Sequence, residues 1–282
     1  MQYGLRVTST VPFQYLAHLL TVPVLAGDVQ MRFILDTGIG VNLLSESAAA
    51  RTGWSATGTT YTGRRMSGQE VRLPIGSVAS VRLGDASGDE VPFGVLDIGA
   101  AAGLDGIDGF LSLNFFRSAP VTVDYPASVV VVEDECSLAL RAESGFPADV
   151  LVEHDGPATQ VRLPLRLPGG KPVSVEVDTG SDALILDEAL AAEAGIDLAD
   201  AAVRKQEGND ETGHTFARYF TTLRGEISVA GAPAIRQAGP EVMFQRIVYD
   251  GLVGNSFLKN FTVTYDLANL MMIFARSPGS DG

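Results

Sequence analysis

The tripeptide Asp-Thr-Gly occurs twice in this chain, and its two aspartates are the residues best placed to do chemistry. The first copy is Asp36-Thr37-Gly38 and the second is Asp178-Thr179-Gly180. Each copy follows one strand-like apolar run and precedes another, so each carboxylate is expected between two half-buried strands. A carboxylate in that position is costly unless the protein uses it. The two motifs are therefore predicted to be functional rather than two unrelated strand-end turns.

A pair of carboxyl groups has a definite chemistry once the two groups lie within about 3 Å of each other. Like charges at that distance raise one pKa strongly, so the pair holds a single shared proton. One member can then take a proton from water while the other protonates a carbonyl oxygen, which suits direct attack of water on an amide. Glycine permits the close approach of the two turns. A buried hydroxyl of Thr37 or Thr179 can hydrogen-bond the backbone of the opposite loop.

The elements around the two motifs repeat along the chain. A shift of 142 residues aligns Asp36 with Asp178, Gly53 with Gly195, residues 108–109 with 250–251, and Phe115 with Phe257. Each unit reads strand, tight turn, strand, Asp-Thr-Gly, strand and short helix, followed by a polar glycine-bearing stretch and alternating strands. The helices are expected over 45–52 and 187–194, with caps at matching positions. Two similar all-β units with one carboxylate each indicate a pseudo-twofold protein whose site lies on the axis.

The repeat also divides the chain. Residues 1–17 alternate apolar and polar positions and predict an edge or inter-lobe strand. The N-terminal lobe is expected over 18–133 and the C-terminal lobe over 159–282. Residues 134–158 match nothing in either unit and are interpreted as the connector.

The two motifs and their surroundings resemble those of the pepsin-like and retroviral-type aspartic proteases. The family motif is apolar-apolar-Asp-Thr-Gly-Ser/Thr/Ala, followed later by apolar-apolar-Gly. Residues 33–38 and 175–181 match its first part, and Leu252-Val253-Gly254 matches its second. The shared-proton logic given above is a standard worked case for this family. The resemblance covers roughly residues 18–133 and 159–275, which is both units.

The resemblance implies a two-lobed, pseudo-twofold β-barrel fold of the acid-protease type with short helices and a cleft between the lobes. It implies that Asp36 and Asp178 are the catalytic pair, supported by Thr37, Gly38, Thr179, Gly180 and Ser181. It also implies an extended peptide bound beneath flaps, meaning β-hairpins that fold over the cleft. Single-chain duplication is the plan of pepsin, whereas the short units look like the retroviral dimer fused into one chain. Two flaps are therefore expected, near Tyr61–Ser67 and Lys205–Thr212. Their candidate substrate-binding residues are Tyr61, Arg64, Met66, Gly208 and Thr212.

Two residues depart from the family pattern. Ile39 stands where the family has a small or hydroxyl residue, whereas its counterpart Ser181 is regular. One interpretation is that Ile39 simply packs without consequence. Our hypothesis is that the missing hydroxyl weakens stabilisation of ionised Asp36, which favours activity nearer neutral pH. Ser112 replaces the glycine of the first apolar-apolar-Gly motif.

Three functions fit such a dyad. The first is an aspartic endopeptidase that hydrolyses a peptide or protein. The second is an enzyme that uses the same dyad as an acid–base pair on a small molecule. The third is a pseudo-protease that binds peptide without cutting it, and two intact Asp-Thr-Gly motifs argue against this one. An open groove across both lobes would favour the first function, and a closed apolar chamber the second.

Composition narrows the partners. The net charge of −14 repels phosphate backbones and anionic lipid, so neither nucleic acid nor a membrane surface is an expected partner. Cys136 is the only cysteine, and the N-terminus lacks the plan of a secretion signal, so we predict a cytoplasmic protein. The three histidines lack metal-ligand spacing, and neither a metal nor a cofactor is expected. The expected state is a monomer.

Overall fold

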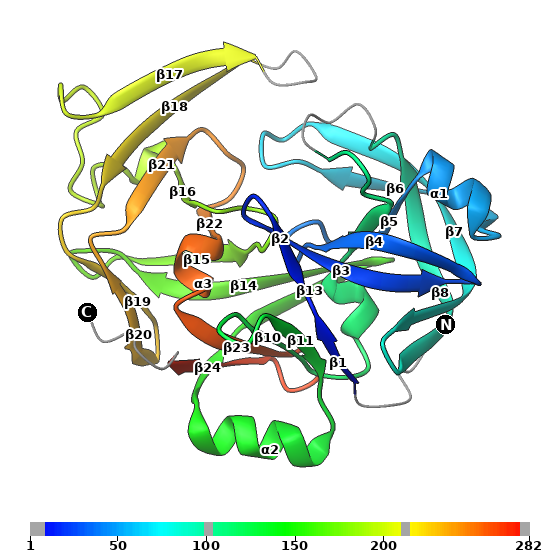
Figure 1. Ribbon diagram of the computed structural model, residues 1–282. Coiled ribbons are helices and arrows are strands. Elements are labelled where there is room, and N and C mark those ends of the chain that lie inside the picture. The colour runs from blue at the N-terminus through cyan, green and yellow to red at the C-terminus, as the bar shows by residue number, and fades with distance from the viewer. Residues whose placement is uncertain (1–8, 99–103, 210–214, 277–282) are drawn as a thin grey trace.

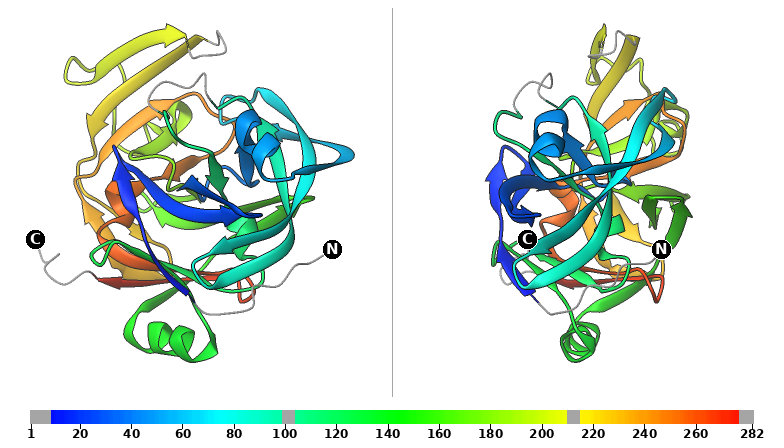
Figure 2. Two further views of the ribbon diagram at one scale, coloured as in Figure 1. Left: turned by 45° about the vertical axis from the view of Figure 1, so that its right-hand side comes forward. Right: turned by 90° about the vertical axis from the view of Figure 1, so that its right-hand side faces the viewer.

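A computed structural model of the chain describes residues 9–98, 104–209 and 215–276. Strands dominate these residues and form two lobes that rest on a shared sheet (Figure 1). The further views in Figure 2 place the helix at residues 135–144 at one end of the molecule and the hairpin at residues 204–222 at the other. The predicted all-β, two-lobed architecture is confirmed.

The first lobe is one sheet with the strand order β2-β3-β4-β9-β5-β8-β7-β6. Its strands are β2 (Gln14–Leu16), β3 (Leu19–Ala26), β4 (Val29–Leu35), β5 (Leu43–Ser45), β6 (Ser55–Arg64), β7 (Glu70–Leu83), β8 (Ala86–Leu96) and β9 (Gly109–Leu111). Leu20, Val22 and Val24 alternate along β3 and are fully buried, as a strand with one face on a core requires. Strand β9 pairs in parallel with β4 and antiparallel with β5. It therefore lies between the two strands that flank the first Asp-Thr-Gly.

The second lobe repeats this arrangement in the order β17-β18-β21-β16-β22-β15-β14-β19-β20, with β13 also paired to β14. Its strands are β13 (Leu151–Asp155), β14 (Ala158–Arg166), β15 (Pro172–Val177), β16 (Leu184–Asp187), β17 (Arg204–Asn209), β18 (Thr215–Thr222), β19 (Glu226–Val229), β20 (Ala232–Ala238), β21 (Glu241–Gln245) and β22 (Gly251–Val253). Strand β22 pairs in parallel with β15 and antiparallel with β16. The second Asp-Thr-Gly is thus flanked in the same way as the first.

A shared sheet joins the lobes and has the strand order β1-β11-β10-β23-β24-β12. This order is symmetric about its centre, because β10 corresponds to β23, β11 to β24 and β1 to β12. Its strands are β1 (Ser9–Pro12), β10 (Val121–Asp124), β11 (Val129–Val132), β12 (Phe146–Asp149), β23 (Phe261–Asp266) and β24 (Met271–Arg276). The two central strands β10 and β23 pair antiparallel, and Thr122 lies opposite Thr264 with their hydroxyl oxygens 2.7 Å apart. These two residues are also 142 positions apart in sequence. The pseudo-twofold axis therefore passes between them.

The symmetry of the shared sheet extends into residues 1–17 and 134–158. Strand β1 borders β11 at one edge, and β12 borders β24 at the other. Strand β2 then pairs with β3, as β13 pairs with β14. Residues 146–155 are thus the structural counterpart of residues 9–16, although no residue match signals this in the sequence.

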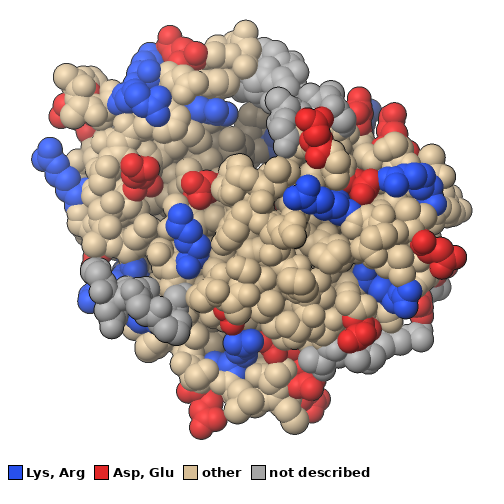
Figure 3. Space-filling view, in the orientation of Figure 1, with Lys and Arg blue, Asp and Glu red and all other residues tan. Residues whose placement is uncertain are grey.

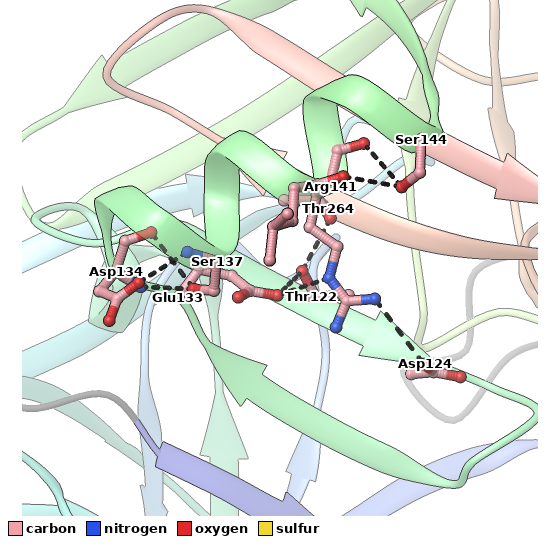
Figure 4. A network of polar contacts seen from close by, with 9 residues as sticks. Thr122, Asp124, Glu133, Asp134, Ser137, Arg141, Ser144 and Thr264 are labelled. Atoms are coloured by element: carbon pink, nitrogen blue, oxygen red, sulfur yellow. Dashed lines mark hydrogen bonds and ion pairs between the residues drawn. The ribbon is translucent and has the colours of Figure 1, made fainter.

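A polar network fixes helix α2 (Glu135–Ser144) against the shared sheet (Figure 4). Buried Glu133 accepts hydrogen bonds from the Thr122 hydroxyl at 2.6 Å and from Arg141 Nε at 2.9 Å. Asp134 caps the helix in a capping box with Ser137. The network connects the helix to the threonine on the axis, and Glu133 Oε2 is buried with no hydrogen-bond partner among the described residues.

The other helices are short. They are α1 (Glu46–Arg51), α3 (Asn255–Leu258) and the 3-10 helices η1 (Leu113–Phe116) and η2 (Glu188–Leu190). The expected first helix forms as α1, capped by the Ser45 hydroxyl and followed by Gly53 at a φ of 67°. The prediction of a second helix over 187–194 is wrong, because a single 3-10 turn and further turns occupy it. Asp187 caps that turn but also accepts the backbone N–H of Ile247, which ties it to the following loop. No helix in the described ranges is long and apolar enough to cross a bilayer.

Candidate active site

The two aspartates lie at the ends of equivalent strands. Asp36 follows β4, and its backbone N–H donates to the carbonyl of Leu111 at 3.0 Å. Asp178 follows β15, and its backbone N–H donates to the carbonyl of Val253 at 3.0 Å. Each motif is thus anchored on the short strand, β9 or β22, that runs between its flanking strands. This local pairing delivers both aspartates to the inter-lobe axis.

The two threonines bind each motif to the opposite lobe. The Thr37 hydroxyl donates to the carbonyl of Val177 at 2.7 Å, and the Thr179 hydroxyl donates to the carbonyl of Leu35 at 2.7 Å. Each hydroxyl also accepts the backbone N–H of the other threonine, at 3.1 and 3.0 Å. Both side chains are buried, at 1% and 0% exposure, so the four hydrogen bonds do not compete with water. The crossed pair fixes the relative position of the two aspartates.

The motif glycines make room for the carboxyl groups of the opposite lobe. A Cβ added at Gly38 would lie 2.5 Å from Asp178 Cγ. A Cβ added at Gly180 would lie 2.5 Å from Asp36 Oδ2. Real Cβ atoms do not tolerate such distances, so any larger residue would displace a carboxyl group.

The carboxyl groups belong to partly buried residues, are hydrogen-bonded to each other and differ in their pKa shifts. Burial and then the charge of Asp178 hold the pKa of Asp36 well above its ordinary range. Burial also raises the pKa of Asp178, against the hydrogen bonds that its carboxylate accepts from Gly180 N–H and from Asp36. Asp36 Oδ1 accepts backbone N–H bonds from Gly38 and Ile39, each at 3.0 Å. Both shifts favour a state in which the pair shares a single proton.

The dyad borders a cavity of about 570 Å³ between the lobes. Its wall contains both dyad residues, apolar side chains of the first lobe such as Val41 and Leu73, and polar side chains such as Gln160. The volume lies within the usual range for a ligand site, about 300–1,000 Å³. In Figure 3 the surface is hollowed beneath the β17–β18 hairpin, and acidic and basic side chains are interspersed around that hollow.

A sequence model of a family described as aspartyl protease matches residues 22–115 and 163–257, which is one match in each lobe. The chain belongs to the aspartyl protease family. Among solved structures, the aspartic proteinase from Irpex lacteus is similar, with a TM-score of 0.56 and 14% identity over 98% of this chain and 99% of that one. At that identity the likeness shows the fold alone. No curated protein matches the chain by sequence.

The first expected flap is the β6–β7 hairpin, and it reaches across the cavity. Tyr61, Arg64 and Met66 all line the cavity. At the hairpin turn, the carbonyl of Met66 accepts the backbone N–H of Val248 in the second lobe at 3.0 Å. The Met66 side chain packs against the apolar cluster that contains Ile247. In this structure the first flap of the protease fold is therefore closed onto the opposite lobe.

The second expected flap is the β17–β18 hairpin, and it stands apart from the cavity. Gly208 lies on β17 against the ring of Phe216 and is absent from the described cavity wall. Thr212 lies outside the described residues. Two arginines of this hairpin stack on its aromatic rings: Arg204 on Phe220 and Arg218 on Phe216, each with its Cζ 4.0 Å from the ring centre. The two hairpins of the family fold are thus held by different contacts.

At the two positions that depart from the family motif, neighbouring residues pack against or hydrogen-bond the unusual side chain. Ile39 is half-buried, lines the cavity and packs on the apolar cluster of Val41 and Leu43. Ser181 gives the Asp178 carboxyl a backbone hydrogen bond, as Ile39 does for Asp36. Ser112 is fully buried, and both its N–H and its hydroxyl donate to Asn42 Oδ1. A polar pair therefore occupies the position where the second lobe has a glycine.

Sequence reasoning missed three groups near the dyad. Asn255 Nδ2 donates to the carbonyls of Thr179 at 2.8 Å and His18 at 2.9 Å. These two hydrogen bonds tie the second Asp-Thr-Gly motif to the backbone of residue 18. The ring of His18 lies 3.2 Å from the carbonyl of Gly180, and its charge helps to lower the pKa of Asp178. Glu176 lines the cavity two residues before Asp178. A polar residue where the first lobe has Ile34 was the signal in the sequence for this last group.

Proposed function

We propose that this protein is an aspartic endopeptidase that hydrolyses peptide bonds in the cavity between its lobes. The observation that carries the proposal is the hydrogen-bonded pair of Asp36 and Asp178, whose raised pKa values favour a single shared proton. Family membership supports a hydrolase of this class. The substrate is a peptide or a protein, Thr37, Gly38, Thr179, Gly180 and Ser181 support the dyad, and no cofactor takes part.

The unequal dyad assigns a role to each aspartate. Ionised Asp178 accepts a proton from water as the water oxygen bonds to the scissile carbonyl carbon. Protonated Asp36 gives its proton to the carbonyl oxygen, which yields a neutral tetrahedral diol. Asp178 then gives its proton to the amide nitrogen, and Asp36 takes a proton from one diol hydroxyl as the carbonyl re-forms and the C–N bond breaks, so that the dyad again holds one proton, on Asp36. Because the carboxyls are desolvated and fixed before the substrate arrives, little reorganisation is needed.

The flap supplies the second part of the proposal. The β6–β7 hairpin covers the dyad, and Tyr61, Arg64 and Met66 contact the substrate from above. The hydrogen bond from Val248 N–H to the Met66 carbonyl breaks to admit a chain. Gly208 of the β17–β18 hairpin is absent from the described cavity wall, so we assign the second hairpin no substrate contact in this closed state.

A second candidate function is acid–base chemistry by the same dyad on a small molecule. The closed first flap favours it, because it confines the cavity from one side. The cavity wall is not an apolar chamber, however, since arginine, glutamine, glutamate and tyrosine side chains line it. Such groups suit the amides of a peptide backbone, so we place the endopeptidase first.

The test is cleavage of a diverse peptide library by the purified chain, with mass-spectrometric detection. We expect cleavage that falls about 1,000-fold or more in Asp36→Asn and in Asp178→Asn, because each variant removes half of the acid–base pair. A transition-state mimic with a central hydroxyl, such as pepstatin, should bind the wild type and inhibit it. If the folded wild type cuts no peptide in the library, or if Asp36→Asn cuts as well as the wild type, the endopeptidase proposal is wrong.

A further inference from the structure

Glu176 is a cavity residue that breaks the symmetry of the dyad region. It lies on β15 at the position that Ile34 occupies on β4, and the two are equivalent in strand pairing. Ile34 pairs with Phe110 of β9, and Glu176 pairs with Leu252 of β22. Both side chains are buried, Ile34 at 0% and Glu176 at 7% exposure. Only the second lobe therefore carries an acid beside the dyad at this position.

The carboxyl of Glu176 is held by neutral donors. Gln160 Nε2 donates to Glu176 Oε1 at 3.2 Å, and the hydroxyl of Tyr249 donates to the same carboxyl group. Gln160, Tyr249 and Leu252 line the cavity with it. Burial raises the pKa of Glu176 to about 7, helped by the charge of Asp178. The group is therefore hydrogen-bonded and poised to ionise near neutral pH.

The nearest protein cation does not neutralise Glu176. Arg162, its neighbour across β14, makes its ion pair with Glu153 at 3.2 Å and lies 5.8 Å from the centre of the Tyr249 ring. Arg162 lowers the pKa of Glu176 less than burial and Asp178 raise it. In the described parts of the chain, Glu176 forms no ion pair within 4.0 Å. A buried acid without a cation is costly, and a ligand that supplies one removes that cost.

We propose that Glu176 is a specificity-determining residue that selects a lysine or arginine side chain of the substrate on the second lobe's side of the scissile bond. This inference rests on the proposed endopeptidase function. A basic side chain that enters beside Leu252 and the Tyr249 ring keeps its methylene stem on apolar surface and its cation on the carboxylate. The groups that shift the pKa of Glu176 are Asp178, Tyr249, Arg162 and Gln160, and of these only Asp178 adds to the attraction for a cation. Among the described residues, Asp36, Arg64 and Arg65 also line the cavity.

The selection has a predicted pH dependence. Below about pH 7 the carboxyl of Glu176 is protonated in the free enzyme and offers a cation only a neutral partner. Above that pH it is ionised, so the preference for a basic side chain should rise through the neutral range. A bound cation favours the carboxylate and should move this rise to lower pH.

The experiment compares peptides that carry lysine or norleucine at each position flanking the scissile bond. Norleucine keeps the unbranched stem of lysine and lacks its charge. At pH 8 we expect the wild type to prefer lysine by about tenfold or more in kcat/KM at one position on the second lobe's side, and Glu176→Gln to reduce that ratio to about one. Glu176→Ile, which copies the first lobe, should reverse it in favour of norleucine. Glu143→Gln, which removes an exposed acid on helix α2 outside the described cavity wall, should leave the ratio unchanged.

The outcomes separate this proposal from the proposed function. An unchanged lysine preference in Glu176→Gln, in an enzyme that cuts peptides, overturns the role of Glu176 and leaves the endopeptidase intact. If the wild type cuts no peptide, calorimetric binding of two hydroxyl-centred peptide mimics, one with lysine and one with norleucine, decides the role of Glu176 without turnover. Tighter binding of the lysine mimic that is lost in Glu176→Gln supports the proposal, and equal binding of both mimics overturns it.

Discussion

The two lobes agree where the dyad is held and differ where a substrate would be recognised. The hydrogen bonds of Thr37 and Thr179 are the same within 0.1 Å on both sides of the axis. By contrast, Glu176 lines the cavity, whereas its counterpart Ile34 is buried and absent from the cavity wall; among the described residues, the β6–β7 hairpin lines the cavity and the β17–β18 hairpin does not. Two carboxyl groups that share one proton need a symmetric frame. A peptide has a direction, and a symmetric pocket would not distinguish its two ends.

The strongest test of the shared frame is loss of either threonine hydroxyl. Thr37→Val and Thr179→Val should each lower the free energy of unfolding by about 3 kcal/mol, because each leaves a buried N–H and a buried carbonyl of the opposite lobe unpaired. Since the contacts are equivalent, the two losses should agree within about 1 kcal/mol. Urea unfolding followed by fluorescence measures both.

Thr60→Val is the control for this comparison. Thr60 is exposed on β6, so the same change there should alter the free energy of unfolding by less than about 0.5 kcal/mol. A loss in one dyad variant that is several times the loss in the other would show that the lobes do not contribute equally to the frame.

The shared frame was predictable from the sequence, because duplication of a motif implies an axis. Two Asp-Thr-Gly copies with flanking apolar strands predict the meeting of Asp36 and Asp178 without any long-range information. The equivalence of residues 9–16 and 146–155 was not predictable, since it is carried by backbone pairing and not by matching side chains. The two segments occupy equivalent positions in the sheets although their residues do not match.

The asymmetric parts were harder to predict for a different reason. A hairpin over residues 58–68 was expected, but its contact with Val248 depends on how closely the two lobes approach each other. Glu176 reads in sequence as one polar position in a strand, and only the folded cavity shows which way it faces. Local pattern determines which elements form, whereas these contacts depend on the distance between elements.

One side-chain substitution in each hairpin tests whether the two hairpins differ in their effect on substrate binding. Met66→Ala removes the side chain with which the first hairpin packs on the second lobe, and we expect KM for a peptide substrate to rise about five- to tenfold. Phe216→Ala is the matched change on the β17–β18 hairpin, whose described residues lie outside the cavity wall, and it should leave KM within about twofold. Steady-state kinetics on one peptide measures both variants. An equal rise in KM for both would mean that the two hairpins act alike on the bound substrate.

The smallest expected effect concerns the difference between Ile39 and Ser181 beside the two carboxyl groups. Both residues give a backbone N–H to the aspartate of their own lobe, so the remaining difference is a hydroxyl group. A serine hydroxyl at position 39 that donates to ionised Asp36 would lower the raised pKa of that group, because a hydrogen bond to the charged form favours it.

Because Asp36 carries the shared proton in the proposed mechanism, loss of activity at high pH reports its ionisation, so Ile39→Ser should move the alkaline limb of the pH–rate profile to lower pH, by about half a unit to one unit. Ile39→Ala is the matched control, because it removes the same apolar contacts with Val41 and Leu43 without adding a hydroxyl. If the alanine and serine variants share one alkaline limb, the hydroxyl has no part in setting the pKa of Asp36. Any shift common to both would then come from the exposure of Asp36 to water, which lowers its pKa by relieving burial.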